Sequence, residues 1–337
     1  MAEKVIKSYK GFDSSLSCRD FQYEVGKEYE MDGPIECCER GFHACESPLE
    51  VFDHYDMLKS RFAEVEQSGT IDREEGSTKV CSSRIKIKAE LKLADIINIG
   101  VEWLKDITSP SKVKTDSLLS DNGERKKQIG SSGDYTKIGS SGDYTKIGSS
   151  GDSAQIGSSG DYTKIGSSGD SAQIGSSGYS AQIGSSGDSA QIGSSGYYAK
   201  IGSSGFYAQI GSSGDYTKIG SSGDSAQIGS SGDSAQIGSS GYYAQIGSSG
   251  DSAQIGSSGD YAQIDSTGAD SVIMCAGYKS KAKAKIGSWI TLAEWVYNEE
   301  KGRYVPVCVK TEYVDGESIK ADTYYQLIDG VFTEVNE

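Results

Sequence analysis

An isoleucine falls on every ninth residue from Ile129 to Ile264, sixteen times without interruption. Around each isoleucine the sequence reads G-D-S-A-Q-I-G-S-S, or a close variant such as G-D-Y-T-K-I-G-S-S. A repeat of nine residues is too short to bury a core of its own, so it has to stack on its neighbours. The pattern therefore predicts a mainly β fold built around a β-solenoid and excludes an ordinary globular domain over this part of the chain.

The alternation of side chains within each repeat predicts one short strand. We expect a strand over residues 135–138, with Thr136 and Ile138 facing inward and Tyr135 and Lys137 facing outward. The Ser-Ser-Gly between strands is typical of a turn in which glycine takes a positive φ. Two repeats per coil would give roughly eight coils and a rod about 38 Å long, at ~4.8 Å per coil. Three repeats per coil are the alternative.

The repeat array separates two regions of ordinary sequence. Residues 1–120 have the pattern of a small α/β domain, residues 121–286 form the solenoid with its linker, and residues 287–337 form a β-meander that caps it. In the first region, Ser47 and Pro48 mark the start of a helix that we expect to reach residue 59. The other expected elements are a helix over 93–107, a linker over 108–128, and strands over 5–9, 61–66, 82–91, 289–297, 304–313, 323–328 and 331–335.

Acidic residues recur along the repeats. The net charge of the protein is −15, and residues 129–268 contain 12 acids and 5 bases. An acidic surface repels phosphates and argues against direct nucleic-acid binding, but it suits a basic partner, including a protein that itself binds DNA. The alternative is that the acids only keep the rod soluble. The predicted acidic ladder consists of Asp134, Asp143, Asp152, Asp161, Asp170, Asp188, Asp215, Asp224, Asp233, Asp251 and Asp260.

Aromatic residues interrupt this ladder. In four repeats a tyrosine or phenylalanine replaces the aspartate, and further tyrosines follow directly. Aromatic side chains are favoured at protein interfaces, although they also stack between neighbouring coils without any partner. We leave both interpretations open for this aromatic zone, which comprises Tyr179, Tyr197, Tyr198, Phe206, Tyr207, Tyr242 and Tyr243.

Five of the seven cysteines lie within the first 81 residues. The N-terminus has no apolar signal segment, and no stretch approaches the ~18 uninterrupted apolar residues of a transmembrane helix. We therefore expect reduced thiols, a cytoplasmic protein and no membrane partner.

The thiols and the two imidazoles offer few chemical motifs. Cys37, Cys38, His43 and Cys45 are residue types that suit zinc, but their spacing matches no common zinc pattern, so we predict no metal and no cofactor. A nucleophilic Cys37 or Cys45 would need His43 or His54 beside it, and the sequence does not reveal such proximity. Calcium-binding nonapeptides place the apolar residue two positions after aspartate, whereas here the isoleucine follows four positions after it, which disfavours calcium.

The order of elements in the N-terminal region resembles the front half of ADP-ribosyltransferase-type folds. The resemblance rests on a strand that ends at residues 9–11, the segment Gly-Phe-His-Ala-Cys at 41–45, and the helix start that follows. It implies an enzyme with a catalytic glutamate, for which Glu64 and Glu66 are the candidates by position, and it assigns no NAD pocket.

The whole layout resembles uncharacterised proteins of bacteria, phages and prophages. These combine the Gly-Phe-His-Ala-Cys domain, a degenerate G-D-x-x-x-x-G-S-S solenoid and a meander containing Ile-Lys-Ala-Asp-Thr-Tyr-Tyr. The resemblance implies a phage-like origin but no activity.

Our preferred hypothesis is a non-enzymatic binding protein in the host cytoplasm, whose solenoid imitates DNA and inhibits a basic nucleic-acid-handling or defence protein of the host. The alternatives are an ADP-ribosyltransferase-like enzyme with the rod as spacer and a structural component of the phage particle; homo-oligomerisation stays open.

Overall fold

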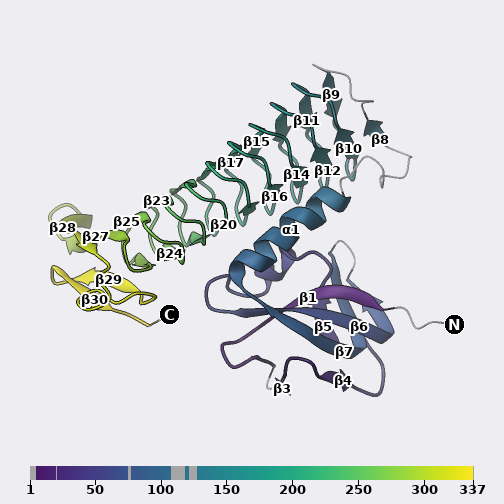
Figure 1. Cartoon of the computed structure of the whole chain (residues 1–337), viewed down its shortest axis with the longest axis horizontal. Helices are drawn as coiled ribbons and strands as arrows, with labels where there is room; N and C mark the ends of the chain where they lie inside the picture. Colours follow the sequence, from purple (N-terminus) through teal and green to yellow (C-terminus); the bar gives the residue numbers. More distant parts are fainter. Residues whose placement is uncertain (1–4, 20, 75–76, 108–117, 121–126, 337) are drawn as a thin grey trace. The chain divides into compact units, whose positions relative to one another are not determined.

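The computed structural model describes residues 5–19, 21–74, 77–107, 118–120 and 127–336 (Figure 1). Its internal contacts divide the chain into an N-terminal body, Met1–Trp103, and a solenoid body, Leu104–Glu337. Strands make up 48% of the protein and helices 4%, so the prediction of a mainly β fold is confirmed.

The repeats form a β-solenoid with two repeats per coil. Each repeat contributes one four-residue strand, beginning with β9 (Gln128–Ser131) and β10 (Lys137–Ser140) and recurring every nine residues to β24 (Gln263–Ser266) and β25 (Val272–Cys275). Each strand pairs in parallel with the strand two repeats on, so that Ile138 lies opposite Ile156. About nine turns stack in this way, with one 12-stranded and one 11-stranded sheet as the two faces (Figure 1).

The strand lies two residues later in the repeat than predicted. Instead of residues 135–138, it covers Lys137–Ser140, and Tyr135 lies in the turn with a φ of 55°. The prediction that a turn glycine supplies the positive φ is also wrong, because the third residue of the repeat takes it. The glycine is required for space: a Cβ on Gly151 would lie 2.0 Å from the carbonyl oxygen of Gly133 in the preceding coil.

Three columns of side chains fill the narrow interior. The isoleucine column and the alanine or threonine column face inward as predicted, and Ile156 and Ala154 are fully buried. The serine that ends each strand forms a third, unpredicted inward column. This column becomes apolar toward the C-terminus, since Ser257 pairs with Cys275 and Cys275 with Leu292. Each buried isoleucine stabilises the stack by about 2 kcal/mol.

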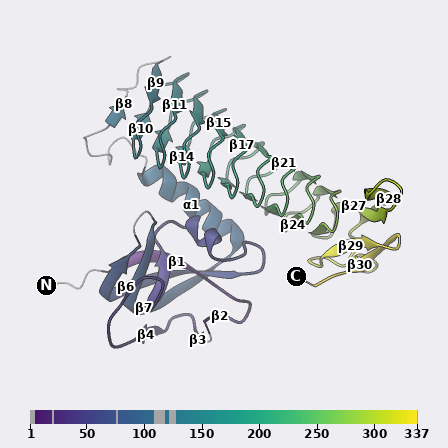
Figure 2. The same ribbon diagram turned by 180° about the vertical axis from the view of Figure 1, so that it is seen from behind.

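Two hairpins close the C-terminal end of the solenoid and confirm the predicted β-meander (Figure 2). Strand β27 (Trp289–Asn298) continues the 11-stranded sheet in parallel with β25 and turns back as β28 (Arg303–Tyr313). Strand β29 (Tyr325–Ile328) pairs antiparallel with both β26 (Lys281–Lys283) and β30 (Val331–Glu334). Each hairpin therefore extends one of the two solenoid sheets.

The start of the solenoid falls within the predicted linker. Strand β8 (Leu118–Ser120) pairs in parallel with β10, and the remaining residues of that linker before Lys127 lie outside the described part of the chain. Helix α1 (Leu93–Ile107) has the predicted bounds. Among the described residues, no helix has the length and apolar character needed to cross a bilayer.

A closed set of antiparallel strands forms the N-terminal body. Strand β1 pairs with β5 and β6, and β7 pairs with both of these, so the four strands close on themselves. Side chains including Phe12, Val65 and Ile87 fill the enclosed core. The strands of this body are β1 (Ile6–Phe12), β2 (Ser17–Cys18), β3 (Phe21–Gln22), β4 (Glu28–Glu30), β5 (Phe42–Cys45), β6 (Arg61–Arg73) and β7 (Lys79–Leu91).

The helix predicted over residues 47–59 is only a 3-10 turn, η1 (Glu50–Asp53). The predicted start is also two residues too early: Leu49 is the N-cap of η1, although the Glu50 amide does donate to Ser47 Oγ at 3.4 Å. The prediction of a long helix is wrong because Asp56 forms its own turn, in which Oδ1 accepts the amide of Leu58 at 2.9 Å. Aspartate side chains that bind nearby amides in this way compete with helical hydrogen bonding.

Candidate functional site

All eleven aspartates of the predicted ladder lie in the turns, and each makes a hydrogen bond between coils. Oδ1 of Asp134 accepts the backbone N–H of Asp152, the equivalent residue one coil on, at 3.0 Å. The other ten make the same bond, at 2.7–3.1 Å. These carboxylates therefore hold consecutive coils together in addition to giving the surface its charge.

The ladder is divided between two opposite edges of the solenoid, because successive repeats alternate between the two sheets. The acidic edge is formed by the turns that lead into the 12-stranded sheet and carries Asp134, Asp152, Asp170, Asp188, Asp224 and Asp260. The tyrosine edge is formed by the turns that lead into the 11-stranded sheet and carries Asp143, Asp161, Asp215, Asp233 and Asp251.

The predicted aromatic zone is divided in the same way. Tyr179, Tyr197 and Tyr198 lie on the tyrosine edge, whereas Phe206, Tyr207, Tyr242 and Tyr243 lie on the acidic edge. The aromatic side chains of the zone thus belong to two separate surfaces. The nine-residue spacing could have revealed this, since residues an even number of repeats apart share an edge.

Stacking accounts for the rings of the tyrosine edge. Tyr179 stacks on Tyr197 with ring centroids 6.0 Å apart and planes 12° from parallel, and Tyr198 stacks on Tyr216 at 5.2 Å. Further contacts through Tyr162 extend the row to Tyr144. The interpretation of coil-to-coil stacking therefore fits this edge.

The acidic edge differs, because stacking accounts for only part of its aromatic content. Tyr243 stacks on Tyr261 at 5.0 Å. In the part of the chain that the structure describes, no ring contact joins Phe206 or Tyr242 to another aromatic side chain, although half of each side chain is exposed. Phe206 has no acceptor atom, and among the described residues the Tyr242 hydroxyl does not accept the amide of Asp260 in the next coil, so neither side chain makes the bond that aspartate makes at this position. Each replacement thus gives up a bond worth about 1 kcal/mol without a compensating stack.

The role of the aspartates in stability is testable at Asp170, which accepts the amide of Asp188 at 2.9 Å. Asp170→Ala removes this acceptor and is expected to lower the free energy of unfolding by about 1 kcal/mol. Asp170→Asn removes the charge but keeps an oxygen acceptor, so it should lose much less. Thermal unfolding of both variants beside the parent measures the difference. Equal losses would show that the charge, rather than the hydrogen bond, stabilises the stack.

A pocket in the N-terminal body is the second candidate site. It lies beside β1 and β5, and its lining includes Lys10, Cys18, His43, Cys45, His54 and Tyr55. Glu64 and Glu66, the glutamates suggested by the ADP-ribosyltransferase resemblance, are not among its lining residues. Their carboxylates form ion pairs instead, with Lys7 at 2.9 Å and with Lys88 at 2.9 Å.

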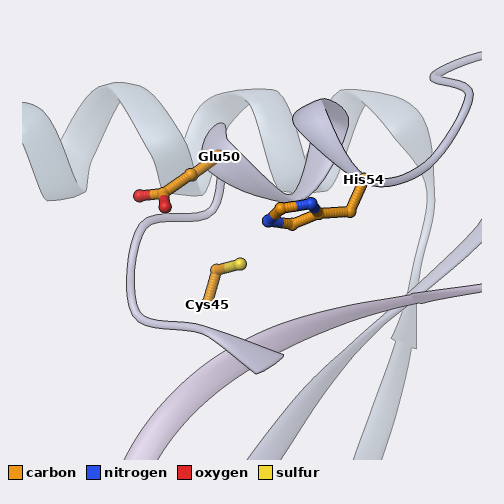
Figure 3. A group of neighbouring side chains, drawn as sticks. All are labelled: Cys45, Glu50 and His54. Carbon is orange, nitrogen blue, oxygen red and sulfur yellow. The ribbon is translucent and has the colours of Figure 1, made fainter. Parts of the chain in front are cut away.

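The structure brings Cys45 close to His54, a pair that the sequence could not place. Their reactive atoms and a carboxylate oxygen of Glu50 lie within 4.8 Å of one another (Figure 3). Burial raises the pKa of the Cys45 thiol and lowers the pKa of His54, so both groups favour their neutral forms. The Glu50 carboxylate accepts hydrogen bonds from Ser77 and Thr78. These features describe a structural cluster better than an activated nucleophile or a metal centre.

The sulfur atoms of Cys37, Cys38 and Cys45 form no ligand cluster with His43 among the described residues. The Cys38 amide donates to His43 Nε2 at 2.9 Å, which uses the acceptor nitrogen of the ring. Burial, reinforced by the positive charge of Lys10, lowers the pKa of His43 to about 4. A neutral imidazole with its lone pair occupied is unavailable as a base, so His43 positions the loop before β5.

Comparison with known proteins gives a match only in the N-terminal body. Neither the curated proteins nor the solved structures contain a match to the chain. A family model matches residues 6–99, which include β1 to β7 and the pocket but none of the repeats. Residues 6–99 are therefore similar to a family described as a domain of unknown function, DUF7666.

Proposed function

We propose that the protein is a non-enzymatic binding protein whose acidic edge contacts a basic surface of a partner protein. The observation that carries this proposal is the placement of Phe206 and Tyr242. Both occupy a position where aspartate would stabilise the stack, and both leave their rings in solvent without a stacking partner among the described residues. Exposed aromatic side chains that cost stability are the type of residue that dominates binding energy at interfaces.

The charge distribution supports a basic partner. Six carboxylates line the acidic edge and five line the tyrosine edge. Four of the five lysines in residues 129–268 lie on the outer face of the 11-stranded sheet, where they begin the strands that follow the turns of the tyrosine edge: Lys146, Lys164, Lys200 and Lys218. A row of like charges at a regular spacing raises the rate of association with an oppositely charged surface. Charge thus supplies steering, and the exposed rings supply contact area.

Imitation of DNA is a finer form of this proposal, in which the partner is a nucleic-acid-handling or defence protein of a phage host. The net charge of the solenoid is too small for it to imitate DNA by charge alone. A DNA duplex about 38 Å long carries roughly 22 negative charges, at one per ~1.7 Å. Residues 129–268 carry 12 acids and 5 bases, a net charge of −7. The rod therefore needs its aromatic side chains, as well as its charge, to compete with DNA for such a partner.

The test compares two variants of equal net charge in a low-salt pull-down from lysate of the cell in which the protein occurs. The acidic-edge variant changes Asp152, Asp170, Asp188 and Asp224 to asparagine, which retains the oxygen acceptors. The matched control changes Asp143, Asp161, Asp233 and Asp251 on the tyrosine edge. We expect the parent and the control to recover a basic, nucleic-acid-binding protein and the acidic-edge variant to lose it. The proposal fails if the parent recovers no such protein, or if both variants lose it equally.

A further inference from the structure

The ammonium group of Lys10 lies inside the N-terminal body. Only 3% of the residue is exposed. Nζ donates to the carbonyl oxygen of His43 at 2.9 Å, and the rings of Phe12, Tyr23 and Tyr55 lie with centroids 5.5–5.9 Å from it. Among the described residues, no carboxylate forms an ion pair with Lys10. A buried cation without an anionic partner costs several kcal/mol, so burial either neutralises the lysine or favours a negative charge beside it.

Cys18 can supply that charge. Its Sγ lies 3.5 Å from Lys10 Nζ and 3.1 Å from the hydroxyl oxygen of Tyr55, which is itself 3.5 Å from Nζ. The three polar atoms therefore form a closed triangle. An ionised sulfur would pair with the ammonium and accept the Tyr55 hydroxyl, which satisfies both buried groups. Burial lowers the pKa of Lys10, and the neighbouring Cys18 opposes this shift.

Cys18 is partly exposed in β2 and lines the pocket together with Arg19 and Arg40. Reactive cysteines are partly open to solvent and lie beside a cationic side chain, and Lys10 is such a side chain next to Cys18. The lining as a whole is mixed in charge, because it also includes Asp13, Glu39, Asp53 and Asp56.

We propose that Cys18 is a reactive nucleophile and a modification site of this domain, with small disulfides as its reagents. The thiolate sulfur attacks one sulfur of the disulfide, so that a new S–S bond to Cys18 forms as the original S–S bond breaks. The other half of the reagent leaves as a thiolate and takes a proton from solvent. The exchange balances without any other oxidant or reductant.

The other thiols lack this combination of features. Burial raises the pKa of Cys45 and of Cys81. Cys38 lies 3.3 Å from Lys79 Nζ, but Lys79 is already paired with Glu74 at 3.3 Å. Cys308 is partly exposed, as Cys18 is, and packs against the apolar core of the C-terminal cap. It is therefore the natural internal comparison for a partly exposed thiol without an adjacent ammonium.

The experiment measures the modification rate of each cysteine in the full chain at neutral pH, first with iodoacetamide and then with glutathione disulfide, by peptide mass spectrometry. We expect Cys18 to react at least roughly tenfold faster than Cys308 with both reagents, since thiolate content sets the rate. Lys10→Met should remove most of this advantage, and Lys10→Arg should retain part of it. Tyr55→Phe, which deletes only the hydroxyl, should slow Cys18 a few-fold.

Equal rates for Cys18 and Cys308 would overturn the proposal, as would an unchanged rate in a folded Lys10→Met variant. Circular dichroism shows whether that variant folds. If the Lys10→Met variant does not fold, the Tyr55→Phe variant provides the test. An unchanged modification rate of Cys18 in Tyr55→Phe would exclude activation of Cys18 by Lys10 and Tyr55. Rapid alkylation without any mixed disulfide would overturn the assignment of disulfides as the reagents. None of these outcomes depends on the solenoid, so the proposed binding function is tested separately.

Discussion

Replacing Gly187 with alanine will separate two coils of the solenoid, whereas the same change at Gly202 will leave the stack intact. A Cβ on Gly187 would lie 2.0 Å from the carbonyl oxygen of Gly169 and 2.9 Å from the amide nitrogen of Asp170. Both are backbone atoms of the preceding coil, so no side-chain rotation relieves the overlap. We expect Gly187→Ala to lower the free energy of unfolding by about 3 kcal/mol.

Gly202 is the matched control, because its ideal Cβ position has no heavy atom within 4 Å. It lies on the outer face of the neighbouring strand β17 (Lys200–Ser203). Alanine is favoured over glycine in a strand by about 0.5–1 kcal/mol, so Gly202→Ala should be neutral or stabilising. Urea unfolding followed by circular dichroism compares the two variants. Similar unfolding midpoints would show that close approach of the coils is not what requires glycine in the turn.

The sequence itself contains the same contrast. The turn position is glycine in every repeat from Gly133 to Gly277. The outward strand position accepts other residues near the C-terminus, where Asp265, Met274 and Lys283 replace glycine. Two glycines of one repeat are therefore under different constraints, which composition alone does not distinguish.

The solenoid was predictable from the sequence because the constraint is local and repeated. Each repeat can bury its isoleucine only against the isoleucine of a neighbouring coil, and this requirement fixes the parallel register of the strands. The position of the strand within the repeat was less predictable. The turn conformation depends on hydrogen bonds to a coil eighteen residues away, such as that from the Tyr135 amide to the carbonyl oxygen of Asp152 at 2.8 Å. The hydrogen bonds of the aspartate side chains also join one coil to the next, as from the Asp152 amide to Asp134 Oδ1. For this reason the sequence alone indicated only their charge and not their role in holding the coils together.

The pocket was unpredictable for a related reason. Lys10 lies on the first strand and Tyr55 follows the 3-10 turn, and only closure of β1, β5, β6 and β7 brings them beside Cys18. The dense run of thiols near His43 is a more conspicuous feature of the sequence, but its side chains contact different partners. One local signal was present: Gly11 follows Lys10, and a Cβ there would lie 2.3 Å from the Tyr55 ring. That glycine marks the close approach of an aromatic side chain.

Ile201→Asp is the second substitution with a large expected effect, because it places a carboxyl group inside the isoleucine column. Ile201 is 3% exposed and lies between Ile183 and Ile219 of the adjoining coils. Loss of the apolar side chain costs about 2 kcal/mol, and a buried carboxyl without a hydrogen-bond partner costs at least about 2 kcal/mol more. We expect the free energy of unfolding to fall by about 4 kcal/mol or more.

The damage should be local, since each coil of a solenoid contacts only its neighbours. Limited proteolysis should therefore cut Ile201→Asp first in the turns on either side of β17, and hydrogen exchange should accelerate in the same coils. Lys200→Asp is the matched control, because it adds a carboxylate one residue earlier on the exposed face. That variant should unfold like the parent. If Ile201→Asp also unfolded like the parent, the column could not be the interior of the rod, and the stacking that positions both edges would need another explanation.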